Sequence, residues 1–268
     1  MKRIISKEAD EFIKDNYEHM SYKDLADMFG VTERQMRGHI NNIGLKKIGK
    51  TTNVDYFKSI DTADKAYWLG FIFADGYIAY NTRRRSYELS MELNTEDKYV
   101  LDILRNDINA AGGVKHKENH KIFNGYEYDT SSDVLRIHSK KICDDLVSLG
   151  VVPNKTNEAS YPKIEKYRSS FVRGFLDGDG CIYISSKNVC YVSFTNSNES
   201  FLKYLNDVVH EELGISGSIY KEKEKKYRLI FYRSSDVKML LDWIYSDCGD
   251  HFLRRKRDKY KSFYGLAA

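Results

Sequence analysis

An internal repeat that fills most of the chain is the feature that most constrains its fold. One copy runs from about residue 61 to 156, and the other from about residue 167 to 264. Each copy begins with an apolar helical segment that ends in Asp-Gly, YWLGFIFADG at 67–76 and FVRGFLDGDG at 171–180. Because self-similarity of this kind marks repeated structural units, the sequence predicts two halves of similar structure.

The two copies also share one order of predicted elements. Each apolar helix is followed by segments that alternate or are rich in β-branched and aromatic residues, YELSMEL (87–93) and CYVSFT (190–195), which are typical of strands. A second helix, a basic hairpin, another strand and a third helix complete each copy. We therefore expect an α+β fold of two pseudo-symmetric α-β-β-α-β-β-α halves, residues 61–160 and 161–268.

Ahead of the repeat, residues 1–45 read as three short helices and residues 46–60 as a linker. Thr32 and Gln35 fit the capping box that opens a helix. A short helix, a turn with glycine and a basic helix are the pattern of a helix-turn-helix. We expect a small all-α DNA-binding unit here. A helical hairpin that serves only for packing is the alternative.

Asp75 and Asp179 are the candidate catalytic residues. Each ends an apolar helix and precedes a glycine that suits the left-handed cap position, and Gly70 and Gly174 lie at matched positions inside the helices. A glycine inside a helix costs about 1 kcal/mol relative to alanine. Two such glycines indicate helices whose backbones approach closely. That packing would bring the two aspartates side by side, whereas one Asp-Gly alone would be an ordinary helix end.

Two carboxylates at adjoining helix C-termini predict a divalent cation. Each faces the negative end of a helix dipole, which costs about 0.3–1 kcal/mol, and two close carboxylates repel each other. A bound divalent cation reverses both penalties. Mg²⁺ prefers oxygen ligands that it shares with phosphate, and metals of this kind drive phosphodiester cleavage. We therefore expect Mg²⁺, with Mn²⁺ as a substitute, at Asp75 and Asp179, with the backbone of Ala74 and Gly178 as further candidate ligands.

The segments WLGFIFADG and VRGFLDGDG resemble the two LAGLIDADG motifs of the homing endonuclease family, and the resemblance covers about residues 61–264. It implies that the motif helices form the interface between the halves and that two antiparallel saddles of strands sit in the major groove of DNA. It also implies that the acid at the eighth motif position, here Asp75 and Asp179, binds the metal. Two positions depart from the motif: Phe73 stands where the family name has Asp, and Arg173 replaces a small residue.

The resemblance further implies a basic residue near the cleaved phosphates, contributed from late in each half. The segments PNKT and LRRKRDK point to Lys155 and Lys256. A lysine there can neutralise transition-state charge or hold the water network, and an exposed surface lysine is the alternative. Asn94 and Asn196 open matched helices and are candidates for orienting water or metal, although helix capping is the more economical account.

Basic clusters at matched positions predict contacts with DNA phosphates, because local clusters matter more than the net charge of +4. An isolated cluster would be an ordinary solvated face. The DNA-binding candidates lie in the front unit, the hairpins and the last basic segment: Arg34, Gln35, Arg37, Lys46, Lys47, Arg83, Arg84, Arg85, Lys115, Lys117, Lys221, Lys223, Lys225, Lys226, Arg254 and Arg255.

We expect a monomeric, metal-dependent endonuclease that cuts both strands of a long, specific DNA site, with intron homing as the role that the resemblance implies. The chain lacks the His-Asn ending of an intein, so a free-standing or intron-encoded protein is expected. The alternative is a non-cleaving DNA-binding regulator or an RNA-splicing maturase of the same fold, with its intron RNA as partner. Two carboxylates beside phosphate would weaken a regulator's binding, which favours the enzyme.

Composition excludes several other classes of protein. No run of about 18 apolar residues could span a membrane, and the first residues, MKRIISKEADEF, lack the apolar stretch of a signal peptide. The four cysteines lack zinc-binding spacing and read as reduced thiols. We therefore expect an intracellular, cytoplasmic protein without a membrane partner.

Overall fold

In the computed structural model, the chain divides into two compact units, Met1–Thr51 and Thr52–Ala268. No described helix is long and apolar enough to cross a membrane. Several predicted DNA-contacting or catalytic residues lie outside the described residues: Lys46, Lys47, Arg83, Arg84, Arg85, Lys155 and Lys225. The structure describes residues 5, 7–17, 20, 22–45, 52–81, 86–123, 126–153, 161–224 and 226–266.

The smaller unit contains the three predicted helices, α1 (Lys7–Asn16), α2 (Tyr22–Met28) and α3 (Glu33–Asn42). A four-residue turn joins α2 to α3, and its Gly30 has a left-handed φ of 61°. Apolar side chains from all three helices form a separate core: Ile13, Leu25, Ala26, Met36 and Ile40.

The predicted capping box at the start of α3 is confirmed. The Thr32 hydroxyl accepts a hydrogen bond from the backbone N–H of Gln35, and the Gln35 side-chain oxygen accepts one from the backbone N–H of Thr32. These two bonds satisfy backbone donors that have no partner within the helix. They fix the residue at which α3 begins.

The first half of the larger unit has the predicted order of elements, with a short 3-10 helix added. Its elements are α4 (Ala63–Asp75), β1 (Tyr77–Asn81), β2 (Ser86–Asn94), η1 (Thr95–Asp97), α5 (Lys98–Asp107), β3 (Lys115–Phe123), β4 (Tyr126–Ile137) and α6 (Lys140–Ser148).

The second half repeats this order and ends in one helix more than predicted, because the last basic segment is helical. Its elements are α7 (Arg168–Asp179), β5 (Gly180–Ile184), β6 (Cys190–Asn196), α8 (Glu199–Leu213), β7 (Ser218–Lys223), β8 (Lys226–Phe231), α9 (Ser234–Tyr245) and α10 (Arg254–Tyr264).

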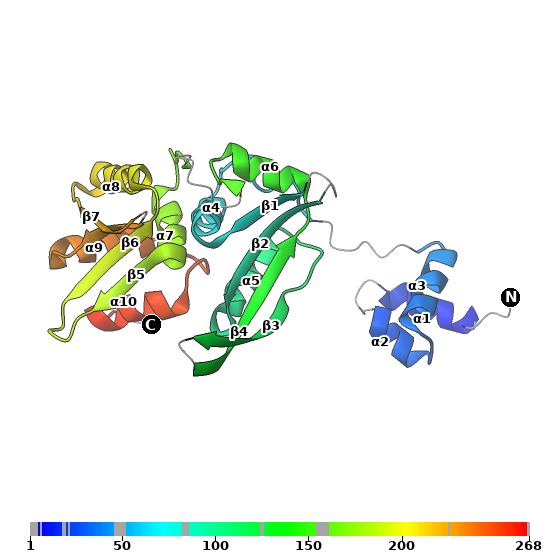
Figure 1. The fold of residues 1–268 in the computed structure, drawn as a ribbon. Coiled ribbons are helices and arrows are strands. Elements are labelled where there is room, and N and C mark those ends of the chain that lie inside the picture. The colour runs from blue at the N-terminus through cyan, green and yellow to red at the C-terminus, as the bar shows by residue number, and fades with distance from the viewer. Residues whose placement is uncertain are drawn as a thin grey trace. The chain divides into compact units, whose positions relative to one another are not determined.

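Each half builds one four-stranded antiparallel sheet, and the two sheets have equivalent topologies. The strand order is β1-β2-β4-β3 in the first half and β5-β6-β8-β7 in the second. Helices α5 and α6 pack on the first sheet, and α8 and α9 on the second. The predicted repeat is therefore a structural repeat, and α4 and α7 lie side by side between the two sheets (Figure 1).

Alternate residues of the central strands are buried, as the two-residue period of a strand requires. Leu89 and Met91 of β2 and Val192 and Phe194 of β6 are buried beneath the helices. We call the opposite surface of each sheet its open face. The residues that alternate with the buried ones define it: Glu88, Ser90, Glu92, Tyr191, Ser193 and Thr195.

Helices α4 and α7 touch backbone to backbone at two glycines, as predicted. A Cβ atom on Gly70 would overlap the carbonyl oxygen of Phe171, and one on Gly174 would overlap that of Tyr67. We call this contact the glycine seam. Only a residue without a side chain allows helix backbones to approach so closely.

The glycines that follow the two aspartates are not in the predicted left-handed conformation. Gly76 has a φ of −69° and Gly180 a φ of −98°, so both are extended. Glycine is required at both positions because there is no room for a Cβ atom. A Cβ atom on Gly76 would lie 2.5 Å from the carbonyl oxygen of Ile72, and one on Gly180 would lie 2.6 Å from that of Leu176. The chain therefore leaves each helix directly into a strand.

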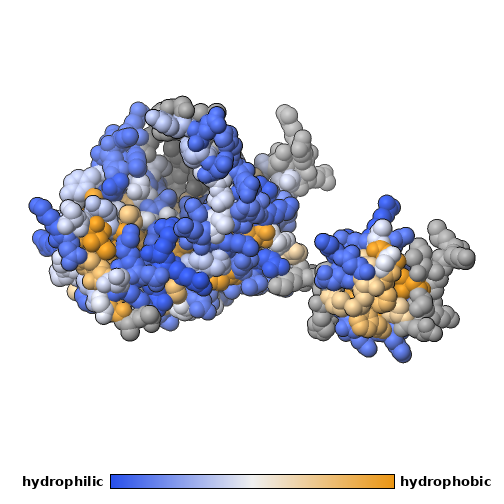
Figure 2. Space-filling view, turned by 90° about the horizontal axis from the view of Figure 1, so that it is seen from below, coloured by the Kyte–Doolittle hydropathy of each residue, from blue (hydrophilic) through white to orange (hydrophobic). Residues whose placement is uncertain are grey.

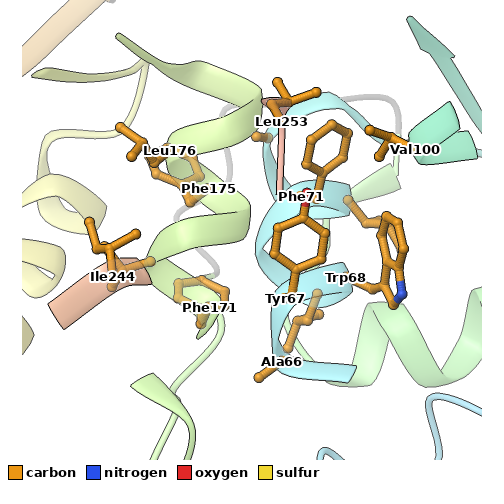
Figure 3. Close-up of a cluster of buried hydrophobic side chains, with 14 of the residues drawn as sticks. Ala66, Tyr67, Trp68, Phe71, Val100, Phe171, Phe175, Leu176, Ile244 and Leu253 are labelled. Carbon is orange, nitrogen blue, oxygen red and sulfur yellow. The ribbon is translucent and has the colours of Figure 1, made fainter. Parts of the chain in front are cut away.

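Large side chains of the two helices point to opposite sides of the helix pair (Figure 3), although the Phe73 ring of α4 reaches the second half, with its centroid 4.6 Å from that of Phe201. Trp68 of α4 lies toward Val100 of α5, whereas Phe175 and Leu176 of α7 lie on the far side. The ring centroids of Phe175 and Phe194 are 6.0 Å apart. Each helix thus belongs to two interfaces at once, its own core and the glycine seam.

The prediction that residues 52–60 belong to a linker is wrong. They pack on the first half. Tyr56 and Phe57 are buried in the main core, and the backbone N–H of Asn53 donates a hydrogen bond to the carbonyl oxygen of Ile108 at 2.7 Å. The aromatic residues in this stretch anchor the chain before α4 begins.

One side of the larger unit, seen from below in Figure 2, is largely hydrophilic. Hydrophobic residues occur there in scattered spots rather than in one continuous patch. Large contiguous apolar patches mark protein or membrane interaction sites. The described residues on this side therefore form no large apolar patch.

Replacing Gly174 with alanine tests the glycine seam. The added Cβ atom would overlap the Tyr67 carbonyl oxygen, and overpacking of this kind costs about 1–3 kcal/mol, with backbone clashes at or above that range. Denaturant unfolding should show Gly174→Ala destabilised by at least about 3 kcal/mol. Gly113→Ala is the control, because no atom lies within 4 Å of its added Cβ. Equal stabilities for the two variants would contradict the close approach.

Candidate metal and nucleic-acid site

The two aspartates at the helix ends lie at one end of the glycine seam. Helix α4 ends at Asp75 and α7 at Asp179, and both residues are half-buried. A Cβ atom on Gly178 would overlap that of Ala74 and would lie only 3.2 Å from the Oδ2 atom of Asp75. The Asp75 carboxylate therefore lies against the last turn of α7, beside the residue that precedes Asp179.

This arrangement offers hard oxygen donors to a cation, but it is only part of a ligand set. Among the described residues, no group of three or more His, Cys, Asp or Glu side chains could hold a metal ion. Two carboxylates would leave most positions of an octahedral ion to other oxygen atoms. Mg²⁺ sites of this kind take one or two carboxylates and complete the set with phosphate and water. The residues present therefore fit such an ion.

Lys256 of α10 is buried behind the end of α7. Its Nζ donates hydrogen bonds to the carbonyl oxygens of Leu176, Asp177 and Gly180 at 2.6–2.7 Å. Burial lowers the pKa of Lys256 to about 8, although the charges of Asp177 and Asp75 act to raise it. The ammonium group thus adds a donor to the carbonyls where α7 ends and β5 begins, and it opposes the negative end of the helix dipole.

This placement differs from the predicted contact of Lys256 with phosphate. An ammonium group has three N–H donors, and all three are directed at carbonyl oxygens. Only 6% of the residue is exposed. The lysine is close to the aspartates, as predicted, but its hydrogen bonds hold the chain where α7 passes into β5. Its long-range charge still acts on Asp75.

Asp177, at the sixth position of the second motif, is a buried structural carboxylate. Its Oδ2 atom accepts hydrogen bonds from the Tyr67 hydroxyl at 3.1 Å and from the backbone N–H of Leu253 at 2.8 Å. Burial raises its pKa to about 6, against the opposing effect of the Lys256 charge. Asp177 therefore joins α7 to α4 and to the start of α10. The equivalent position in the first motif, Phe73, instead contacts aromatic rings.

Arg173, the other departure from the motif, is buried in the second half. Its Nε donates to the carbonyl oxygen of His251 at 2.8 Å, and a terminal amino group donates to that of Ile244 at 2.7 Å. The other terminal amino group donates to the Ser170 hydroxyl. A buried guanidinium needs such acceptors, and here they come from α7, from the end of α9 and from the segment between α9 and α10. Arg173 therefore anchors that segment to α7.

His251 connects the same segment to the first half. Its Nε2 atom lies 2.7 Å from the Oδ2 atom of Asp107, which also accepts a hydrogen bond from the Trp68 indole N–H. Its Nδ1 atom lies 3.2 Å from a carboxylate oxygen of Asp64. Sequence reasoning missed His251, because an isolated histidine after α9 gives no signal of partners in another half. Arg173, a charged residue within an apolar helix, was the one sequence signal that pointed to this region, because a buried arginine needs acceptors such as the His251 carbonyl.

The predicted DNA contacts Arg254 and Arg255 are also engaged by the first half. The guanidinium of Arg254 lies over the Tyr99 ring, 4.3 Å from its centroid. The Nε of Arg255 lies 2.9 Å from the Oδ2 atom of Asp97, whose side chain is almost fully buried. These contacts make both arginines part of the interface between the halves.

Asn94 is the N-cap of η1, whereas the N-cap of α8 is Asn198 rather than Asn196. The side-chain oxygen of Asn94 accepts a hydrogen bond from the backbone N–H of Glu96 at 3.1 Å. That of Asn196 accepts one from the backbone N–H of Asn198 at 2.8 Å. Both amides therefore fix the turn that follows a central strand, and the predicted capping role applies to Asn94.

Lys115 and Lys117 lie on the open face of the first sheet. Lys117 pairs with Ser132 across β3 and β4, and its Nζ lies 2.5 Å from a carboxylate oxygen of Glu92. Lys115 pairs with Val134 on the same face. The register therefore presents both lysines on the side of the sheet away from the helices.

The lysines of the second hairpin are divided between the two faces. Lys221 pairs with Tyr227, which places it on the helix-covered side of the sheet. Beyond a β-bulge, Lys223 pairs with Lys226, whose Nζ lies 3.1 Å from a carboxylate oxygen of Glu222. The bulge thus turns the end of the hairpin, so sequence spacing alone did not predict which lysines share a face.

In the smaller unit, Arg34 and Arg37 of α3 are exposed. Arg37 lies 3.0 Å from Glu33 in an exposed ion pair, which contributes little to stability. Gln35 is exposed, but its side-chain oxygen accepts the capping hydrogen bonds from Thr32. The two arginines are therefore the basic groups that α3 presents to solvent.

Comparison with known proteins shows which proteins the chain is similar to. A family model described as a LAGLIDADG-like domain matches residues 166–258. The uncharacterized protein MJ0314 of Methanocaldococcus jannaschii is 26% identical over 200 residues, which cover 70% of each chain. MJ0398 of the same organism is 24% identical over 188 residues, or 65% of this chain and 63% of that one. The chain thus spans less than two thirds of MJ0398.

Solved structures share the fold. The homing endonuclease I-WcaI bound to its DNA recognition sequence gives a TM-score of 0.55 at 15% identity, over 77% of this chain and 90% of that one. The meganuclease I-SmaMI bound to uncleavable DNA gives a TM-score of 0.51 at 15% identity, over 74% and 88%. In its two matched halves and in the family-model match over residues 166–258, the chain is similar to LAGLIDADG homing endonucleases.

Proposed function

We propose that the chain is a site-specific endonuclease that hydrolyses both strands of duplex DNA, with a divalent cation held between Asp75 and Asp179. The observation that carries this proposal is the glycine seam, which ends with the Asp75 carboxylate against Gly178. Two carboxylates beside a phosphate would weaken DNA binding unless a cation neutralised them. Their presence therefore favours a metal-dependent nuclease over a non-cleaving regulator.

The chain's own residues would act by binding and positioning. The two aspartates would hold Mg²⁺, or Mn²⁺ in its place, and the scissile phosphate would complete the set of oxygen ligands. Such an ion, when bound, stabilises charge on phosphoryl oxygens and lowers the pKa of bound water. Lys256 would keep the end of α7 in place through its three carbonyl contacts. Arg173 would hold the segment that leads into α10, the helix of Lys256.

Double-stranded DNA is the proposed substrate. The related folds I-WcaI and I-SmaMI are DNA-bound in their solved structures. In this chain, the open faces carry the cations needed to approach a polyanion, among them Lys117, Arg136 and Arg228. One chain supplies both aspartates, so a monomer would complete the site. A role in intron homing rests on the family resemblance alone.

We further propose that the smaller unit adds contacts outside the central site as a helix-turn-helix. Support comes from the four-residue turn with Gly30 and from the exposed Arg34 and Arg37 on α3. In this motif the helix after the turn, here α3, enters the major groove. The unit would lengthen the DNA site without taking part in catalysis.

Asp75→Asn and Asp179→Asn test the metal site. Asparagine keeps the shape of aspartate but loses the charge that the cation needs. Losing even the outer partners of a metal ligand costs about 10–100-fold in activity, so each variant should lose at least about 100-fold in double-strand cleavage. DNA affinity, measured in parallel by gel shift, should survive. Asp207→Asn, on the exposed side of α8, is the control and should cleave normally. Undiminished cleavage by either motif variant would end the assignment.

Lys256→Met tests the positioning of α7. The variant would leave three carbonyl oxygens and the buried Asp177 without their cation. Each buried acceptor left unsatisfied costs about 1–3 kcal/mol, and we expect a total loss of at least about 3 kcal/mol in denaturant unfolding. Lys259→Met in the same helix removes one 3.1 Å bond to the carbonyl oxygen of Ile182 and should cost far less. Similar costs for both variants would argue against the buried role.

Deleting residues 1–50 tests the smaller unit. The truncated chain begins just before the larger compact unit, so cleavage should persist. Nuclease protection should give a shorter footprint, and the affinity should fall because phosphate contacts are lost. In the full chain, Arg34→Ala combined with Arg37→Ala should weaken binding in the same direction. A footprint of unchanged length after deletion would make this unit a packing element.

A further inference from the structure

The open face of the first sheet contains a polar cavity. Its volume is about 530 Å³, and it lies where β2, β3 and β4 meet the turn that precedes β3. It is open to solvent and carries both signs of charge. The cavity is lined by Glu88, Gly112, Gly113, Lys115, Val134, Arg136 and His138.

Glu88 is the acid of this cavity, and two cationic or basic groups hold it. The Nε of Arg136 lies 3.3 Å from one carboxylate oxygen, and the Nδ1 atom of His138 lies 3.6 Å from the other. The Glu88 side chain is 24% exposed and that of Arg136 is 41% exposed. A guanidinium has five N–H donors, so Arg136 can pair with Glu88 and still donate to a further acceptor.

Glu92 repeats this arrangement further along β2. Its carboxylate lies 2.5 Å from the Nζ of Lys117 and accepts a hydrogen bond from the Ser132 hydroxyl at 2.6 Å. The hydrogen bond from Lys117 lowers the pKa of Glu92, so the carboxylate stays ionised. The open face thus presents two acid–base pairs: Glu88–Arg136 on the neighbouring strands β2 and β4, and Glu92–Lys117, which reaches across β4 from β2 to β3.

The equivalent surface of the second sheet has a different chemistry. Its described positions carry hydroxyls, a thiol, an aliphatic side chain and one arginine: Tyr183, Tyr191, Ser193, Thr195, Cys181, Ile230 and Arg228. Glu222, near the end of the hairpin, pairs with Arg228 at 2.6 Å. The two halves share a backbone plan, but they present different hydrogen-bonding groups to anything that crosses both sheets.

Resting on the proposed DNA-binding function, we propose that each of these two pairs recognises a C·G base pair in the major groove. A carboxylate on a surface that meets a polyanion needs a hydrogen-bond donor, and phosphates have none. Cytosine offers its N4 amino group there, and the guanine opposite offers O6 and N7 as acceptors. Glu88 accepts from cytosine while Arg136 donates to guanine. Glu92 and Lys117 divide a second base pair in the same way.

The spacing of the two pairs sets the spacing of the two base pairs. Four residues along a strand span about 13 Å. With β2 along the groove, that distance equals about four base-pair steps of 3.4 Å. B-form DNA admits strands and side chains into its major groove, whereas the major groove of A-form RNA is too deep and narrow for side chains to read. The pairs therefore fit duplex DNA.

The test is selection of bound duplexes from a random DNA library by the full chain in Ca²⁺, followed by sequencing. The wild-type site should contain two C·G base pairs about four steps apart. Glu88→Gln should convert one of them to a preference for A·T, because glutamine pairs with adenine, and Glu92→Gln should convert the other. Each change should exceed about 5-fold in relative affinity, the lower end of what one good contact discriminates.

Two further variants make the result specific. Arg136→Ala should relax the same base pair as Glu88→Gln and leave the other unchanged. Glu118→Gln is the matched control on β3, because Glu118 pairs with Ser131 and lies on the opposite side of the sheet from the open face. It should select the wild-type site.

The outcomes separate this inference from the function on which it rests. If the wild-type chain selects a defined duplex and the Glu88, Glu92 and Arg136 variants select the same one, the recognition pairs are wrong and DNA binding stands. If the wild-type chain enriches no duplex and instead retains structured RNA, both this inference and the proposed function fail.

Discussion

The backbone contact between α4 and α7 is the constraint on which the rest of the structure depends. Gly70 and Gly174 leave no room for a Cβ atom on either helix, so the two helices touch along their length and end together. Because Asp75 and Asp179 terminate these helices, the contact determines how near the two carboxylates lie. The same helices lie in the hydrophobic core, so the positions of the two carboxylates and the core are stabilised by the same residues.

A second set of interactions holds the C-terminal side of this arrangement. The segment between α9 and α10 is bonded to α7 by Arg173 and to the first half by His251. Lys256 lies in the next helix, α10, and donates hydrogen bonds to the end of α7. Buried charges are costly unless every donor and acceptor is satisfied. Here the acceptors are mostly backbone carbonyls, which fixes the path of the chain as well as the side chains. The extra helix of the second half, α10, therefore contributes to the interface between the halves through Arg254 and Arg255.

Local and periodic patterns predicted much of this. The repeat, the order of strands and helices, the capping box at Thr32 and the close approach at the glycine seam all follow from spacing along the chain, and the structure confirms them. The buried role of Lys256 did not follow, since its three acceptors lie far away in sequence. Nor did the packing of Phe57 on the first half, because two aromatic residues in a polar stretch do not reveal their partners. Long-range contacts and hairpin bulges are what the sequence alone left open.

Anomalous X-ray scattering from Mn²⁺ tests the central claim most directly. Crystals of the full chain bound to a duplex that it has selected would be grown with Mn²⁺, and the ion located from its anomalous signal. The account predicts a peak in contact with the carboxylates of both Asp75 and Asp179 and with a phosphate of the DNA. A peak bound elsewhere, or two motif carboxylates on separated helix ends, would contradict it.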